Sequence, residues 1–78
     1  MSSYGDIQSN IGQKVLVTWT AEARLNYERL QDEDYGVLLG FNEGYVTLRS
    51  GRGGQLAGMA DLVVRPLGID LLYQREKK

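Results

Sequence analysis

The amino-acid sequence predicts a mainly β protein in which a short N-terminal helix precedes a five-stranded, strongly bent antiparallel small barrel. Two segments carry most of this prediction. Residues 36–50 and residues 62–74 each place a turn marked by Gly or Pro between two β-like apolar runs. Gly36 and Gly40 flank a third feature, a short apolar strand that can bend sharply at residues without side chains, as small barrels require. A chain of 78 residues is long enough for one domain, expected over residues 1–78.

Residues 1–12 predict the short helix. The serines at its start are suitable N-caps, and Tyr4, Ile7 and Ile11 recur at helical spacing. Gly12 then ends the pattern.

The barrel is expected over residues 13–74, and its first strand over residues 14–20. This segment is rich in β-branched residues, which favour strands. Alternate apolar side chains share one face, which is expected to point into the core. The residues on this face are Val15, Val17 and Trp19.

Residues 21–34 are compatible with two structures. Apolar residues continue to alternate through the first part of this stretch, which favours an extension of the first strand into a projecting hairpin arm. The same segment contains good helix formers, and Ala23, Tyr27 and Leu30 would share one helical face. The acidic cluster over residues 32–34 is expected to be a solvated loop. A cation site is the alternative, since carboxylate oxygens are the ligands that Mg²⁺ and Ca²⁺ prefer.

The middle of the chain predicts a hairpin. A strand over residues 35–41 and a partner over residues 45–49 are joined by a three-residue loop, residues 42–44. Gly44 would supply the left-handed residue of a G1 bulge in that loop. The glycine-dense segment over residues 50–55 predicts a flexible loop rather than a phosphate-binding loop, because it lacks the known glycine spacings.

The last two strands are expected over residues 62–65 and 69–73. Residues 66–68, Pro-Leu-Gly, suit the tight turn between them. The polar tail over residues 75–78 is expected to fray.

The composition excludes several classes of function. The chain contains no Cys and no His, so it lacks disulfides, the common zinc sites and the usual catalytic bases and nucleophiles. We therefore expect a protein that is not an enzyme and uses no cofactor. Nine basic residues against ten acidic ones give a formal charge of -1, without the basic excess typical of nucleic-acid binders. A domain this small buries only about 60% of its unfolded surface, and oligomerisation is the means of stabilisation that the composition leaves.

No apolar run approaches the roughly 18 residues that a membrane span requires. The first residues also lack the charged and then apolar pattern of a signal peptide. We therefore expect no membrane association and a cytoplasmic location.

The order of a helix, five strands and two marked turns resembles the Sm-like family, which comprises the Sm, LSm and bacterial Hfq proteins. Residues 36–48, GVLLGFNEGYVTL, are similar to the first Sm motif. The matching positions are Gly36, Leu38, Gly40 and Phe41, while Asn42 replaces the family's Asp. Residues 63–69, VVRPLGI, are similar to the second motif. Val64, Arg65 and Ile69 match it, whereas Pro66 and Gly68 replace the family's Gly and Asn.

The resemblance implies a ring of about five to seven identical subunits. The fourth strand of one subunit, residues 59–65, would pair with the fifth strand, residues 69–73, of the next, which would cover both exposed edges. The expected interface residues are Met59, Leu62, Val63, Val64, Ile69, Leu71 and Tyr73.

The resemblance also implies binding of single-stranded RNA near the pore of the ring, through Phe41, Asn42 and Tyr45 in the first loop and Arg65 in the second. Tyr45 would stack on a base, and Arg65 would meet phosphate or stack. Each residue also has a structural alternative. Phe41 can be a core aromatic, Asn42 can stabilise its turn, Tyr45 can pack within the sheet, and Arg65 can pair with an acidic residue.

The alternative function is a protein-interaction or structural module, either a ring or a monomeric barrel of the SH3-like class, that does not bind RNA. Three features favour it: the near-zero net charge, Tyr45 in place of the family's RNA-contacting Asn, and the additional stretch over residues 21–34.

Overall fold

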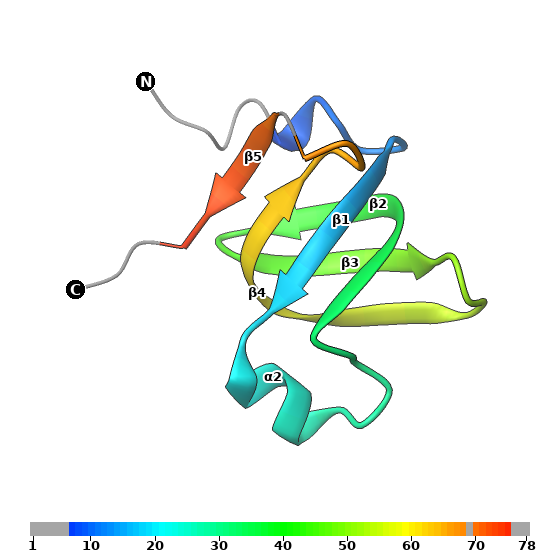
Figure 1. The fold of residues 1–78 in the computed structure, drawn as a ribbon, viewed down its shortest axis with the longest axis vertical. Helices are drawn as coiled ribbons and strands as arrows, with labels where there is room; N and C mark the ends of the chain where they lie inside the picture. Colours follow the sequence, from blue (N-terminus) through cyan, green and yellow to red (C-terminus); the bar gives the residue numbers. More distant parts are fainter. Residues whose placement is uncertain (1–6, 69, 76–78) are drawn as a thin grey trace.

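The computed structural model describes residues 7–68 and 70–75, which contain five strands, the helix α2 and, at Ile7 and Gln8, a helical turn. In chain order the strands and the helix are β1 (Lys14–Trp19), α2 (Ala21–Asn26), β2 (Glu33–Asn42), β3 (Tyr45–Ser50), β4 (Gln55–Val64) and β5 (Leu71–Gln74). Figure 1 shows them wound into a small barrel with the helix at one end. The structure confirms the predicted fold class of a mainly β small barrel.

Four antiparallel strands close this barrel, and the fifth lies outside it. The sheet order is β1-β2-β3-β4-β5, and an additional pairing of β1 with β4 completes the circle. Closure with four strands is possible because β4 is ten residues long: its first half pairs with β3 and its second half with β1. The register shifts within the β1–β4 pairing, which marks the bend between the two halves. β5 then pairs with Leu62–Val64 on the edge opposite to β1.

The interior of the barrel is filled by the inward-facing residues of these strands. In β1, Val15, Val17 and Trp19 are buried, as the alternating pattern predicts. β3 and β4 contribute alternate buried residues in the same way, as expected for antiparallel strands with one face on the core. Residues 1–6 of the predicted N-terminal helix lie outside the described residues. Of its other apolar residues, Ile7 is buried and Ile11 is exposed.

Gly36 and Gly40, which the sequence analysis treats alike, have different structural roles. A Cβ atom on Gly36 would overlap the backbone carbonyl of Arg49 on β3, whereas one on Gly40 would meet nothing within 4 Å. The close approach of β2 and β3 therefore requires glycine at position 36 only. The register shift between Leu38 and Gly40 changes which side chains face the core, so that Leu38 and Phe41 are both buried.

The turn between β2 and β3 is tighter than predicted. Asn42 pairs with Tyr45, which leaves a two-residue loop in place of the expected three-residue loop with a G1 bulge. Glu43 and Gly44 both have positive φ, 51° and 88°, as a type I′ turn requires. The backbone twist of a type I′ turn matches the right-handed twist of the two strands, so the hairpin closes without a bulge at its tip.

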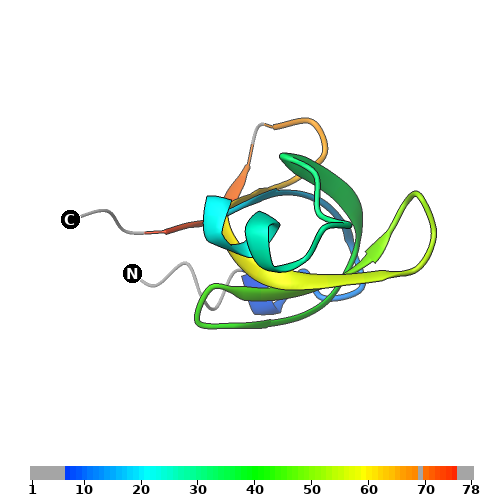
Figure 2. The same cartoon turned by 90° about the horizontal axis from the view of Figure 1, so that it is seen from below.

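Residues 21–34 form a helix and a loop, which confirms the helical alternative and excludes the extended hairpin arm. Figure 2, a view turned by 90°, shows α2 lying over one end of the barrel. The helix ends at Asn26, yet Ala23, Tyr27 and Leu30 all pack against the core. Among residues 7–68 and 70–75, no helix is long and apolar enough to cross a membrane.

β4 and β5 also differ from their predicted limits. β4 begins at Gln55 and not at residue 62. Its first half contains no β-branched residue, so the sequence pattern does not indicate a strand there. The predicted turn over residues 66–68 is present, and the N–H of Gly68 donates to the carbonyl of Arg65 at 2.7 Å. β5 begins at Leu71, two positions later than predicted.

We predict that Gly36→Ala destabilises the protein strongly and that Gly40→Ala does not. The new Cβ at position 36 must displace the backbone of β3, with an expected loss of about 3 kcal/mol in the free energy of unfolding. At position 40 the same change should alter this free energy by less than about 1 kcal/mol. Urea unfolding of both variants measures the difference, and equal losses would contradict the assignment.

Candidate functional site

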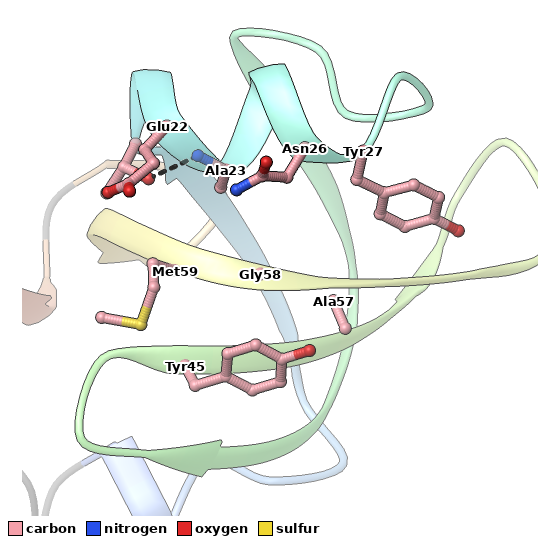
Figure 3. Close-up of a pocket in the computed structure, with 9 residues that line it drawn as sticks. Glu22, Ala23, Asn26, Tyr27, Tyr45, Ala57, Gly58 and Met59 are labelled. Carbon is pink, nitrogen blue, oxygen red and sulfur yellow. Dashed lines mark hydrogen bonds between the residues drawn. The ribbon is translucent and has the colours of Figure 1, made fainter.

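A groove with a volume of about 500 Å³ lies between α2 and the outer face of β3 and β4. Figure 3 shows the helix along one side of the groove and the two strands along the other. Its lining residues are Thr20, Glu22, Ala23, Asn26, Tyr27, Tyr45, Ala57, Gly58 and Met59.

The helical side of the groove is fixed by an N-cap and by close packing on β4. The Thr20 side chain accepts a hydrogen bond from the N–H of Ala23 at 3.0 Å, which caps α2. The N–H of Thr20 donates to the carbonyl of Met59, so the start of the helix is held on β4. A Cβ atom on Gly58 would lie 3.3 Å from that of Ala23 and 3.1 Å from Leu30. Two small residues, Ala23 and Gly58, therefore let the helix lie close to the strand.

Two tyrosines form the apolar walls of the groove. Tyr27 follows the last residue of α2, packs partly against the core, and donates from its hydroxyl to the carbonyl of Gln55 at 3.3 Å. Tyr45 begins β3 opposite Met59 of β4, and both side chains point outward. In Figure 3, Ala57 lies between the two tyrosine rings. The ring of Tyr45 is half exposed, so it is free to contact a ligand.

Glu22 is the charged residue of the groove lining, which contains no basic side chain. Asn26, Thr20 and the tyrosine hydroxyls supply the other polar groups. The groove therefore combines apolar walls with a single negative charge. Among the described residues, no three acidic side chains converge in a way that would hold a metal ion.

The Asp34 carboxylate fastens the segment that follows α2 to the barrel. Its Oδ2 atom accepts hydrogen bonds from the indole N–H of Trp19 at 2.9 Å and from the N–H of Gln31 at 3.0 Å. Its Oδ1 atom accepts from Nε and Nη2 of Arg52, at 3.0 and 2.6 Å. Nη2 of Arg52 also donates to the carbonyl of Arg29. The network thus joins β1, the loop after α2 and the loop between β3 and β4.

This network corrects the prediction that residues 32–34 form a solvated loop. Glu33 and Asp34 belong to β2, and the Asp34 side chain is only 2% exposed. Asp32 alone behaves as predicted: its carboxylate is 89% exposed and pairs with Arg24 at the surface. The burial of Asp34 follows from donors that lie far away in the sequence.

Three of the four predicted RNA-binding residues, Phe41, Asn42 and Tyr45, lie at or beside the β2–β3 turn, whereas Arg65 lies at the β4–β5 turn. Phe41 is buried and packs against Tyr73 with a ring separation of 4.8 Å. Asn42 is exposed at the β2–β3 turn, and Tyr45 faces the groove. Arg65 lies at the β4–β5 turn, where it pairs with Asp70 at 2.9 Å and lines a different hollow beside Lys14.

The predicted interface residues differ in their exposure. Val63 and Tyr73 are buried within the chain itself, whereas Met59 and Leu71 are exposed. Leu62 and Val64 are partly buried, and Ile69 lies outside the described residues. Both edges of β4 at Leu62–Val64 are already paired, one with β1 and the other with β5. Within the single described chain, this stretch of β4 therefore has no unpaired edge.

Glu22, Asn26 and Tyr27 line the groove, but the sequence analysis did not identify them as site residues. Their position depends on α2 folding back onto β4, which is a non-local contact. The sequence does contain one signal for this site. Residues 21–34 are additional to the barrel strands, and a helix formed there has to pack against the sheet.

Comparison of the chain with protein-family models, with curated proteins and with solved structures finds no match.

We predict that Asp34→Ala lowers the free energy of unfolding by about 3 kcal/mol, because it leaves the buried indole and amide donors without acceptors and Arg52 without its partner. Asp32→Ala, two residues earlier, is the matched control. It removes an exposed ion pair and should cost less than about 1 kcal/mol. Urea unfolding monitored by Trp19 fluorescence measures both variants. A similar loss for the two would show that the buried network does not hold the structure.

Proposed function

We propose that the protein is a non-catalytic binding module whose groove between α2 and β4 binds an extended peptide segment of a partner protein. The observation that carries this proposal is the lining of the groove: Tyr27 and Tyr45 on either side of a floor of Ala57 and Gly58. Tyrosines offer large apolar faces with a polar hydroxyl and are among the residues that contribute most to binding at protein interfaces.

The shape and charge of the groove favour a peptide over RNA. The outward-facing β4 residues of the groove include Ala57, whose small side chain leaves room for an extended chain. RNA binding depends on Lys and Arg contacts to phosphate, and the charged residue of this groove is Glu22. Arg65, the basic residue of the Sm-like expectation, is paired with Asp70 and lines another hollow.

We predict that Tyr45→Ala weakens peptide binding about tenfold, since removing an anchoring aromatic costs 1 kcal/mol or more and about 1.4 kcal/mol corresponds to a factor of ten. The ligand is obtained by panning a random-peptide display library on the protein, and affinities are measured by fluorescence anisotropy. Tyr35→Ala is the control, because Tyr35 is also an exposed tyrosine but lies on β2 outside the groove. Equal losses for both variants, or a library that yields no binder, would contradict the proposal.

A second candidate function is the homo-oligomeric Sm-like ring that binds single-stranded RNA. It is favoured by the exposure of Tyr45, Met59 and Leu71, which are residues expected at the RNA site and at the subunit interface. Such a ring would not use Leu62–Val64, since β1 and β5 of the same chain occupy both edges there.

Native mass spectrometry and oligonucleotide binding test this second candidate. If the protein is a peptide-binding module, lowering the salt concentration should not increase its affinity for oligouridylate or oligoadenylate. Arg65→Ala should leave both of these affinities unchanged. A ring requires a native mass of about five to seven times the 8.7 kDa chain. Such a mass, together with RNA binding that Tyr45→Ala and Arg65→Ala both weaken, would replace the first proposal by the second.

A further inference from the structure

The two ends of the groove differ in chemistry. Figure 3 shows Glu22 near Met59 at one end of the groove and Tyr27 at the other. Tyr45 starts opposite Met59, and its ring extends toward Ala57. Among the ion pairs of residues 7–68 and 70–75, none involves the Glu22 carboxylate. The groove therefore offers an uncompensated negative charge at one end, the aromatic face of Tyr27 at the other, and the ring of Tyr45 along the strand side between them.

The spacing on the strand side of the groove matches the repeat of an extended peptide. Met59 and Ala57 are two positions apart on β4, which corresponds to about 7 Å. Side chains at positions i and i+2 of an extended chain project to the same side with this separation.

We propose that the groove reads two side chains of its peptide ligand: a basic side chain at position i, paired with Glu22, and an apolar or aromatic side chain at position i+2, held between Tyr27 and Tyr45. This inference rests on the proposed peptide-binding function and adds the class of partner, an extended segment with the pattern basic-x-apolar. Charge complementarity selects the basic residue, because Glu22 is the charged group of the lining.

Arginine is the basic residue that fits this site best. Its planar guanidinium can bind the two carboxylate oxygens of Glu22 through parallel N–H groups. Its stem can lie along the apolar side chain of Met59, which is exposed at the same end. The residue at i+2 would then rest on the small side chain of Ala57, which lies between the two tyrosine rings.

The sequences obtained by panning the random-peptide library provide the first test. We expect the selected peptides to share a basic residue two positions before an apolar or aromatic one. Panning on Glu22→Lys should instead enrich an acidic residue at that position. Glu28→Lys is the matched control, because Glu28 is an exposed acid on the same segment outside the groove, and it should leave the basic preference unchanged.

The second test uses the tightest-binding peptide of that library and its variant with citrulline in place of the basic residue. Citrulline keeps the shape of arginine without its charge, and we expect about a fivefold loss of affinity on the wild-type protein and no loss on Glu22→Gln. Glu22 lies on the exposed face of α2, so Glu22→Lys and Glu22→Gln should both leave the protein folded.

The outcomes separate this inference from the proposed function. Peptides whose binding requires Tyr45 but shows no basic preference and no effect of Glu22→Gln would overturn the inference and leave the peptide-binding function intact. Failure of the library to yield any binder, or binding of oligouridylate that competes with the selected peptides, would overturn both.

Discussion

The buried carboxylate of Asp34 is the contact through which distant parts of this chain are held together. Trp19 of β1, Gln31 in the loop after α2 and Arg52 in the loop after β3 all donate to it. Each of these segments has its own local structure, but the carboxylate fixes their positions relative to one another. A buried charge is expensive to remove from water, and here four donor groups and a cation offset that cost. The network thus specifies one arrangement of the loops around the barrel.

The groove depends on this arrangement. α2 is only six residues long and would be marginal on its own, so its position is determined by what lies on either side of it. Thr20 fixes its start on β4, and the loop that ends at Asp34 fixes its return to β2. Contact between Ala23 and Gly58 then sets how closely the helix approaches the strand. Together these three contacts hold α2 beside β4, and the groove is the space between them.

The sequence contains enough information to predict the barrel, because strand alternation and turn residues are local signals. Val15, Val17 and Trp19 face the core as their spacing requires, and the turn at residues 66–68 is present. The start of β4 was missed because Ala57, Gly58 and Ala60 have low strand propensity and form a strand only by pairing with β3 and β1.

The candidate site was less predictable because it is made by contacts between segments that are far apart in the chain. Asp34 looks like part of an acidic surface run, and only donors 15 and 18 residues away show that it is buried. Tyr45 was expected to be a binding residue, and its exposure is consistent with that prediction. Its neighbours in the groove, Glu22 and Tyr27, come from the helix and not from the β4–β5 turn that the Sm-like resemblance indicated.

We propose that the groove under α2, and no other face of the barrel, binds the peptide. Titration of a ¹⁵N-labelled protein with a peptide selected from the library tests it most directly, because each backbone amide reports its own environment. The account predicts that chemical-shift changes are confined to α2, Tyr45 and Ala57–Met59. Changes centred on Arg65 and residues 66–68, or spread evenly over the barrel, would contradict it.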